Sequence, residues 1–389
     1  MSRSDSTARQ TRPVILYVVT EDWYFWSHRV DLARAARDAG YHVVVATRTR
    51  EHRNRIEAEA FECVDLPFER SMRKPWRDLQ IARRVHRLIR DTHPVLVHLV
   101  ALKPMLLSAL AVLVNPQTKF LHAATGLGYV FSQAGLGTQL IRWIVRILLR
   151  TSVNRKNCWL LVQNEDDRTL LHSLGIGTPR RTRLIAGSGV DTKTFVVTPY
   201  PVTEPALVIL PARMLRHKGI IEFVHAAAIV RKTLPTVRFA LVGPTDPSNP
   251  AAFTDQELRS LSDVHRVEWW GACSEMHASY AAAFLVCLPS YREGIPKVLL
   301  EAAACGRPIV TVDTPGCRDV CHNGVNGILV PAADSGQLAK AILSLLEDPA
   351  LATAMGGAGR ALVEKRYSSD IINAQTLELY AEIIAEKLA

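Results

Sequence analysis

The sequence lacks the signature motifs of several large enzyme classes. No G-x-G-x-x-G motif follows the first predicted strand, where TEDWYFWSHR stands instead. The sequence therefore lacks the main evidence for a dinucleotide-dependent oxidoreductase. The seven cysteines form no C-x-x-C pair and mostly lie in apolar runs, which predicts reduced thiols in a cytosol rather than a disulfide or metal framework. The polar N-terminus has no apolar run typical of a secretory signal peptide. No D-x-D pair occurs, so the chain offers no obvious carboxylate pair for a divalent cation.

The composition of the 389 residues is that of a globular chain with two domains. Hydrophobic residues make up 48% and charged residues 22%, and no repeat of solenoid length is present. The net charge of +10 is uneven: residues 1–190 hold 29 Lys and Arg against 16 Asp and Glu, whereas residues 191–389 hold 18 against 21. The basic first half indicates an anionic partner, namely a membrane surface, a nucleic acid or a phosphorylated substrate.

Short apolar runs alternate with helical patterns along the chain, which predicts two doubly wound α/β domains with parallel sheets. A proline-rich stretch at 196–205 is the expected linker. We expect a flexible tail at 1–12, domains at 13–195 and 206–366, and a C-terminal helical segment at 367–389. The helical pattern that begins at Ser335 is expected to be interrupted near Pro349 and at Gly356–Gly359.

One apolar stretch, Val95–Val114, is long enough to be considered as a membrane span. His98, Lys103 and Pro104 interrupt it. The pattern therefore favours a buried strand, a loop and a helix.

The most informative segment is LPSYREGIPKVLLEAAACGRPIVTVDTPG. It predicts a buried strand, a turn at the carboxyl end of that strand, and a helix with Pro296 in its first turn. The N–H groups from Gly294 to Lys297 then form an anion site that the helix dipole supports. Glu293 and Glu301 lie on either side of this site, although each alone is also consistent with a structural role in a turn or on a helix.

Two cations are expected at the same edge of the second sheet. Arg213 follows the strand ALVIL and Lys218 opens the next helix, so both can neutralise a diphosphate. A solvated loop with two exposed charges would give the same pattern.

Together these motifs resemble the retaining glycosyltransferases of family 4, which have the GT-B fold of two facing Rossmann-like domains with a cleft between them. The resemblance rests on Glu-x7-Glu, ARMLRHKG, GSGVD and NGVNGILVP, and spans essentially the whole chain. It implies a nucleotide sugar as co-substrate, with no metal and no cofactor. It also implies that Glu293 lies beside the donor sugar and that Arg213 and Lys218 hold the leaving diphosphate. The donor-binding residues expected by this resemblance are Glu301, for the ribose hydroxyls, and Gly294, Ile295, Pro296, Lys297, Val298 and Gly189.

The first domain is similar to a bacterial subgroup of this family that extends polyprenyl-diphosphate-linked oligosaccharides for capsule, exopolysaccharide, O-antigen or protein glycosylation. The runs TEDWYFWSHR, VHLVALKPML, TGLGYVF and LVQNEDD carry this similarity. It implies transfer of an N-acetylhexosamine or hexose from a UDP-sugar, and acceptor-site candidates at Asp22, Lys103, Thr125 and Gly126. Many members have a histidine after the strand KFLHAA, but here the only nearby histidine is His122, inside the strand.

A basic amphipathic segment, TQLIRWIVRILLR, lies in the same half. Arg142, Arg146 and Arg150 recur at spacings of four beside Trp143 and further apolar residues, a pattern typical of a helix on anionic lipid. A helix packed on its own sheet is the alternative. We expect a cytoplasmic protein attached peripherally to the inner face of the plasma membrane.

Three other functions stay open on the sequence. A UDP-sugar 2-epimerase would share the fold, and a glycosyltransferase with a soluble acceptor would share the donor motifs. A nucleic-acid-binding protein would suit the basic charge, but no zinc, helix-turn-helix or RNP pattern favours it. By analogy with GT-B proteins, the helices after Tyr367 are expected to cross back to the first domain.

Overall fold

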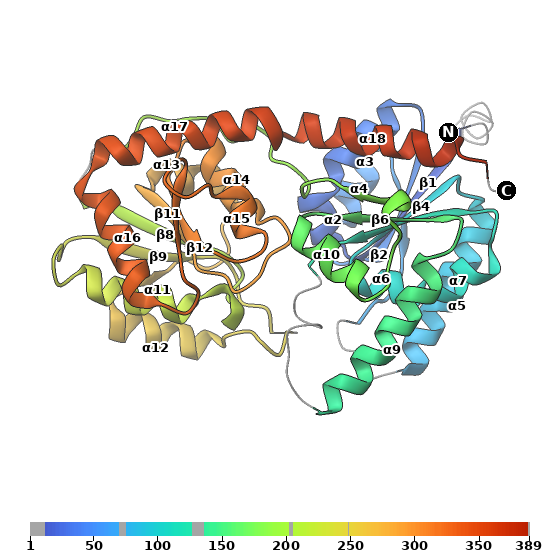
Figure 1. The fold of residues 1–389 in the computed structure, drawn as a ribbon, viewed down its shortest axis with the longest axis horizontal. Coiled ribbons are helices and arrows are strands. Elements are labelled where there is room, and N and C mark those ends of the chain that lie inside the picture. The colour runs from blue at the N-terminus through green and yellow to red at the C-terminus, as the bar shows by residue number, and fades with distance from the viewer. Residues whose placement is uncertain (1–11, 70–74, 127–135, 202–204, 248, 388–389) are drawn as a thin grey trace. The chain divides into compact units, whose positions relative to one another are not determined.

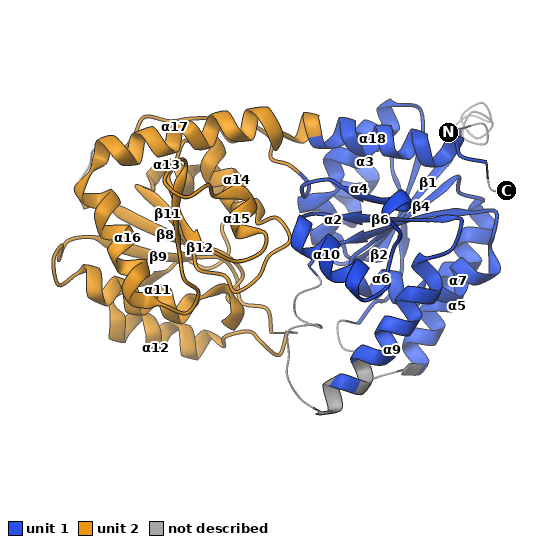
Figure 2. Ribbon diagram, in the orientation of Figure 1, with its two compact units in different colours: residues 1–188, 372–389 blue, residues 189–371 orange. Residues whose placement is uncertain are grey.

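The structure, a computed structural model, describes residues 12–69, 75–126, 136–201, 205–247 and 249–387 (Figure 1). Residues 1–11 of the expected tail and residues 202–204 of the expected linker lie outside these ranges. The chain forms two compact units (Figure 2). Unit 1 comprises Met1–Ser188 and Ile372–Ala389, and unit 2 comprises Gly189–Ile371. The boundary falls before the expected linker, and the end of the chain belongs to unit 1.

Unit 1 is built on a parallel seven-stranded sheet with the order β3-β2-β1-β4-β5-β6-β7. Every residue of β4 and β6 is buried, because apolar clusters cover both faces of the sheet. The strands are β1 (Val14–Glu21), β2 (His42–Arg48), β3 (Glu62–Asp65), β4 (Leu96–Val100), β5 (Lys119–Ala124), β6 (Cys158–Val162) and β7 (Thr182–Leu184). The helices are α2 (Asp22–His28), α3 (Val30–Asp38), α4 (Arg53–Ala58), α5 (Pro75–Thr92), α6 (Leu102–Leu107), α7 (Ala109–Val114), α9 (Leu136–Val153), α10 (Glu165–Ser173), η1 (Pro179–Arg181) and, from Ile372 on, α18 (Ser369–Ala385).

The stretch Val95–Val114 resolves into a strand and two helices rather than one span. β4 is followed by α6 and α7, and Ala101 between β4 and α6 has a φ of 74°. Across the described residues, no helix combines the length and the apolarity needed to cross a membrane.

The C-terminal helix α18 completes the core of unit 1. Its Tyr380 is fully buried, and its hydroxyl is hydrogen-bonded to Nδ1 of His98 on β4 at 2.5 Å. The same hydroxyl lies 3.1 Å from the hydroxyl of Tyr17 on β1. Burial holds the pKa of His98 well below its usual range, so this imidazole is neutral at pH 7.

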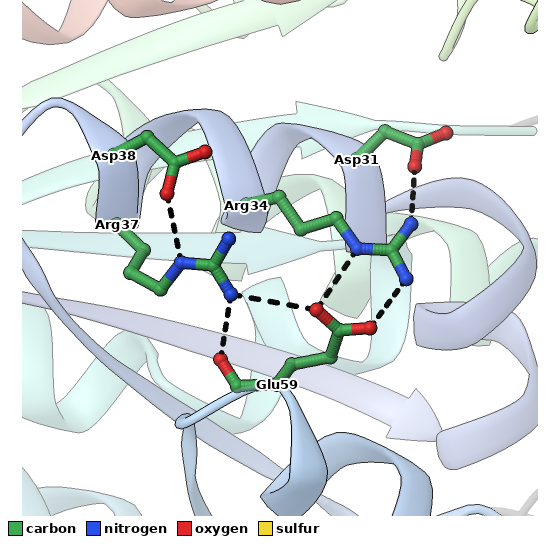
Figure 3. Close-up of polar contacts among 5 residues, drawn as sticks. All are labelled: Asp31, Arg34, Arg37, Asp38 and Glu59. Atoms are coloured by element: carbon green, nitrogen blue, oxygen red, sulfur yellow. Dashed lines mark hydrogen bonds and ion pairs between the residues drawn. The ribbon is translucent and has the colours of Figure 1, made fainter.

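A cluster of charges joins α3 to the residue that follows α4 (Figure 3). The Glu59 carboxylate accepts a hydrogen bond from Nε of Arg34 at 3.0 Å and another from Nη1 of Arg37 at 3.4 Å. Nη1 of Arg37 also donates to the Glu59 backbone carbonyl at 2.8 Å. Asp31 and Asp38 each pair with one of these arginines at 2.9 Å. The hydrogen bond from Arg34 holds the pKa of Glu59 below its usual range, against a smaller effect of burial. The cluster fixes α3 against the chain between α4 and β3.

Unit 2 has a parallel six-stranded sheet with the order β10-β9-β8-β11-β12-β13. The strand order reverses between β8 and β11, where doubly wound sheets bind ligands. The strands are β8 (Leu207–Pro211), β9 (Arg238–Val242), β10 (Glu268–Trp269), β11 (Leu285–Leu288), β12 (Ile309–Val312) and β13 (Gly327–Val330). The helices are η2 (Arg216–Lys218), α11 (Ile220–Val230), α12 (Asp255–His265), α13 (Met276–Ala282), α14 (Lys297–Ala304), α15 (Cys317–Val320), α16 (Ser335–Glu347) and α17 (Pro349–Arg366).

The expected break at Gly356–Gly359 is wrong, because α17 runs through it without interruption. A Cβ at Gly356 would lie 2.0 Å from the carbonyl oxygen of Gly306, and one at Gly359 would lie 3.3 Å from Cβ of Ala303. These glycines therefore let α17 pack closely against α14 and the chain that follows it. The break near Pro349 is confirmed, since α16 ends at Glu347 and Pro349 opens α17.

The chain that leads into β8 is bound to unit 2 by one buried arginine. Arg307, 1% exposed, donates from Nη2 to Oγ1 of Thr198 at 2.6 Å and to the carbonyl of Pro199 at 3.2 Å. Its Nε donates to the carbonyl of Tyr280 at 2.9 Å. Part of the expected linker is thus an ordered piece of unit 2.

Candidate functional site

The carboxyl edge of the unit 2 sheet collects the predicted donor-site residues. Arg213 and Lys218 follow β8, and Glu293 follows β11, the strand beside it. Glu301 lies inside α14, the helix that comes next. Because all strands of the sheet are parallel, the loops after β8, β9, β11 and β12 meet at this one edge.

Lys218 and Glu293 form a pair across the point where the strand order reverses. Lys218 Nζ donates a hydrogen bond to Glu293 Oε1, and both side chains are mostly buried, at 16% and 13% exposure. The loops that carry them are also joined by their backbone, since Tyr291 N donates to the His217 carbonyl at 3.0 Å. Burial alone would raise the pKa of Glu293, but the charge of Lys218 and its hydrogen bond hold it below the usual range. Glu293 is therefore ionised at pH 7.

The loop after β12 fixes the backbone beside Glu293. Glu293 N donates to the Pro315 carbonyl at 3.2 Å. Gly316 has a φ of 82°, and a Cβ at this position would lie 2.4 Å from the Gly294 carbonyl oxygen and 2.7 Å from that of Glu293. Only glycine allows this approach, so Gly316 sets the position of the Glu293–Gly294 peptide.

Arg213 pairs with a carboxylate other than Glu293. Its Nη1 donates to Oδ2 of Asp246, in the loop after β9, at 2.8 Å. The arginine side chain is 38% exposed, whereas the aspartate is 10% exposed. Asp246 was not foreseen, because its position beside Arg213 depends on the pairing of β8 with β9 and no sequence motif marks it.

The start of α14 lies one residue later than expected. Pro296 precedes the helix as its N-cap residue, with φ of −74° and ψ of 103°, and the helix begins at Lys297. The N–H groups of Lys297 and Val298 thus belong to the first turn, whose N–H groups have no acceptor within the helix. Gly294 and Ile295 lie in the turn between Glu293 and this helix. The geometry is that of a helix N-terminus that can bind an anion.

Glu301 is buried at 8% exposure and is held by Tyr280. The Tyr280 hydroxyl donates to Glu301 Oε2 at 2.8 Å, and Lys297 Nζ lies 3.9 Å from Oε1. Burial raises the pKa of Glu301 above its usual range, and the charge of Lys297 and the Tyr280 hydrogen bond offset only part of this effect. Tyr280 is a second residue that the sequence motifs did not reveal.

The remaining donor-site candidate, Gly189, lies where the chain enters unit 2. It has a φ of 70°, and a Cβ there would lie 2.8 Å from Cα of Ser369. The structure thus gives Gly189 a packing role against the start of α18, and its contact with a donor stays a prediction.

Two acceptor-site candidates in unit 1 are occupied by protein contacts. Asp22 is 1% exposed, and its carboxylate accepts hydrogen bonds from the backbone N–H groups of Arg50 at 2.6 Å and His52 at 3.0 Å. It therefore holds the loop after β2. Lys103 pairs with Asp78 of α5 at 2.9 Å and donates to the Glu69 carbonyl. A direct contact of either residue with an acceptor stays a prediction.

The other two candidates, Thr125 and Gly126, follow β5. The Thr125 hydroxyl is buried and has no hydrogen-bond partner in the described part of the chain. Gly126 has a φ of 81°, and among the described residues no atom outside its immediate chain neighbours lies within 4 Å of where its Cβ would be. His122, inside β5, is fully buried, and burial lowers its pKa to about 3. This histidine is therefore neutral at pH 7 and shielded from solvent, so it does not supply an exposed imidazole after β5.

Helix α9 packs on the rest of unit 1 through Val145, Leu149 and Val153, which are buried. Other apolar side chains of α9 form an exposed row along the helix. The arginines border this row: Arg146 Nε donates to the Leu174 carbonyl at 2.9 Å, and Arg150 lies against Gly175. Exposed apolar residues continue on α7 and α5, which pack together, and α7 also packs against α9. The exposed apolar set, called the apolar face below, comprises Trp143, Ile144, Ile147 and Leu148 of α9, Leu110, Leu113 and Val114 of α7, and Trp76 and Leu79 of α5.

The described residues contain no group of three or more His, Cys, Asp and Glu side chains placed to hold a metal ion. Six of the seven cysteines are buried, and Cys273 is partly exposed.

Two family descriptions match the chain, one in each unit. Residues 14–156 match "Glycosyl transferase 4-like", and residues 205–348 match "Glycosyl transferases group 1". The second range contains all the donor-site candidates except Gly189.

The chain is similar to curated proteins over most of its length. It is 28% identical to the N,N'-diacetylbacillosaminyl-diphospho-undecaprenol alpha-1,3-N-acetylgalactosaminyltransferase of Campylobacter jejuni, over 67% of this chain and 69% of that protein. It is 25% identical to the putative glycosyltransferase EpsD of Bacillus subtilis, over 95% of both chains. Among solved structures, Alr3699/HepE of Anabaena in complex with UDP-glucose resembles it with a TM-score of 0.77 and 19% identity, over 95% of this chain and 99% of that one. This likeness shows the fold.

Proposed function

We propose that this chain, a glycosyltransferase with the GT-B fold, moves a hexose or N-acetylhexosamine from a UDP-sugar to a polyprenyl-diphosphate-linked saccharide, with retention at the anomeric carbon and without a metal ion. The observation that carries the proposal is the pairing of Lys218 with an ionised Glu293 beside the N-terminus of α14, with Glu301 buried in the same helix.

The donor diphosphate is the group that this edge of the sheet suits best. A lysine ammonium has three N–H groups, so Lys218 can bond Glu293 and a phosphate oxygen at the same time. Arg213, whose Nη1 donates to Asp246, adds a second positive charge at this edge of the sheet. The first-turn N–H groups of α14 add a partial positive charge. Support for UDP comes from the Anabaena structure, which contains UDP-glucose.

In the proposed reaction, the bond between C1 of the sugar and the β-phosphate oxygen breaks while the acceptor hydroxyl oxygen bonds to C1 from the same face. The hydroxyl proton passes to the departing phosphate oxygen. Negative charge grows on that oxygen as the bond breaks, so Lys218, Arg213 and the start of α14 stabilise the transition state more than the bound donor. Glu293 keeps Lys218 in place and balances its charge.

The proposed acceptor brings the enzyme to a membrane surface. On α9, the residues of the apolar face alternate along the helix with Arg142, Arg146 and Arg150, which suits a layer of anionic lipid in which the polyprenyl chain is embedded. The Campylobacter relative is named for an undecaprenol-linked substrate. Two other similar proteins are named as a capsular polysaccharide biosynthesis glycosyltransferase and an exopolysaccharide phosphotransferase.

The experiment that tests the proposal is UDP release by the purified protein, with a panel of UDP-sugars and a polyprenyl-diphosphate oligosaccharide extract, each reaction being run with and without EDTA. Release that needs one UDP-sugar and the extract supports the proposed donor and acceptor, and release that is lost when EDTA is added contradicts metal independence. Conversion of the donor without any acceptor would instead support a 2-epimerase. Release with a soluble sugar in place of the extract would support a soluble acceptor.

A further inference from the structure

Resting on the proposed function, we propose that Tyr280 is the positioning residue for Glu301: it fixes one carboxylate oxygen by a hydrogen bond and leaves the other oxygen to accept from a ribose hydroxyl of the donor nucleotide.

The Tyr280 side chain is held from several directions. It is fully buried, its backbone carbonyl accepts from Nε of Arg307 at 2.9 Å, and its ring contacts that of Phe195 edge-on with centroids 5.9 Å apart. The hydroxyl therefore has a defined position, 2.8 Å from Glu301 Oε2. A short buried hydrogen bond to a carboxylate restricts the rotation of that carboxylate.

The second carboxylate oxygen of Glu301, Oε1, is not fixed by a hydrogen bond in the described part of the chain. Within the described part of the chain, Oε1 accepts no hydrogen bond, and the nearest cation, Lys297 Nζ, is 3.9 Å away. This distance is too long for a hydrogen bond. Oε1 thus has a nearby cation and spare capacity to accept a hydrogen bond, which is the arrangement that a ligand hydroxyl needs.

The charge on Glu301 depends on few groups. Lys297, on the same helix, and Tyr280, on α13, both favour the ionised form against the effect of burial, and the Cys305 thiol on the next turn is also close enough to interact. A protonated Glu301 would offer an O–H instead of a second acceptor, so nucleotide binding should weaken as the pH falls. Loss of the Tyr280 hydroxyl raises the pKa of Glu301 and moves this weakening to higher pH.

The test is the affinity for UDP, measured by calorimetry between pH 5 and 8 on the full chain. We expect Tyr280→Phe to weaken UDP binding about tenfold at pH 7, the effect of about one hydrogen bond to a charged group. We also expect the weakening of UDP binding at low pH, called the acid limb below, to begin at a higher pH in this variant than in the wild type. The matched control is Tyr200→Phe, which removes a buried hydroxyl of unit 2 that donates to the Phe284 carbonyl at 2.5 Å and does not touch Glu301.

Repeating the Tyr280→Phe change in a Glu301→Gln variant separates an effect on the position of Glu301 from a general loss of structure. In Glu301→Gln, we expect the weakening of UDP binding at low pH to shrink to the part caused by protonation of the UDP terminal phosphate, whose second pKa is about 6. We expect the added Tyr280→Phe change to weaken UDP binding less than about twofold in this background, because the two effects share one interaction. If Tyr280→Phe does not fold, the test is the pH dependence of UDP binding by Glu301→Gln. An acid limb that is unchanged in that variant overturns the inference. Wild-type UDP binding that Tyr280→Phe leaves unaltered in strength and pH dependence overturns the inference and leaves the proposed function standing. A wild-type protein that binds no nucleoside diphosphate overturns both.

Discussion

Lys218 donates a hydrogen bond to Glu293 across the point at which the strand order of unit 2 reverses. Each residue follows a different central strand, so the pair exists only once β8 and β11 lie side by side. The pair links the integrity of the sheet to the charge balance of the proposed donor site.

Lys218→Met should lower kcat about 100-fold, because it removes a cation from the oxygen on which charge develops. It should also lower the free energy of unfolding by about 2 kcal/mol, since it leaves a buried carboxylate without its partner. UDP release and urea unfolding measure the two effects. In the double variant with Glu293→Gln, stability should largely return while activity does not. Recovery of activity in the double variant would contradict the proposed role of Lys218.

Arg213→Ala should lower kcat about tenfold, a smaller effect than at Lys218 because the guanidinium is more exposed and its charge is better screened. The control is Arg216→Ala, in the same loop, which breaks an exposed pair with Glu257. Steady-state kinetics of UDP release compare the two. Equal losses in both variants would show that loop charge in general, rather than Arg213, matters.

Glu59→Gln should cost about 1 kcal/mol of stability at pH 7 through its effect on the cluster in Figure 3. The pKa of Glu59 is lower in the folded protein than its ordinary value of 4.5, so its stabilising contribution is present above that value and is lost as the pH falls through the folded pKa. Urea unfolding at pH 7 and at pH 3 should show the difference between wild type and variant shrinking at the lower pH. Glu57→Gln, which breaks the exposed pair with Arg53, serves as the control and should have little effect at either pH.

Trp143→Ser with Ile147→Ser should reduce binding to anionic liposomes at least about tenfold, because both side chains belong to the apolar face and would lose their burial in lipid. Flotation with purified protein measures the bound fraction. Val264→Ser, at a residue of unit 2 that is 72% exposed, is the matched control. Flotation that neither variant alters, or that does not depend on anionic lipid, would contradict membrane attachment by this face.

The arrangement of strands could be predicted from the sequence because buried parallel strands appear as continuous apolar runs, such as CWLLV and FLVCLP. The same reasoning placed Glu293 and Lys218 at one edge, since carboxyl ends of parallel strands meet there. Partners that come from other loops could not be predicted: Asp246 beside Arg213 and Tyr280 beside Glu301 are set by side-chain packing. The predicted break at Gly356–Gly359 was wrong for the same reason, because these glycines allow a close contact between α17 and another helix that the sequence does not show.

The contact of Tyr380 with Tyr17 and His98 has a consequence for how the protein is made. Tyr17 and Tyr380 are 363 residues apart, yet both belong to the core of unit 1. During vectorial synthesis the first strands leave the ribosome long before α18 exists, so part of the apolar surface of unit 1 stays uncovered until α18 has been made. Unit 2, whose segment from Gly189 to Ile371 is continuous, can complete its own core earlier. The half of the protein that is synthesised first is therefore the half that finishes folding last, and a premature stop near the C-terminus would harm the N-terminal unit.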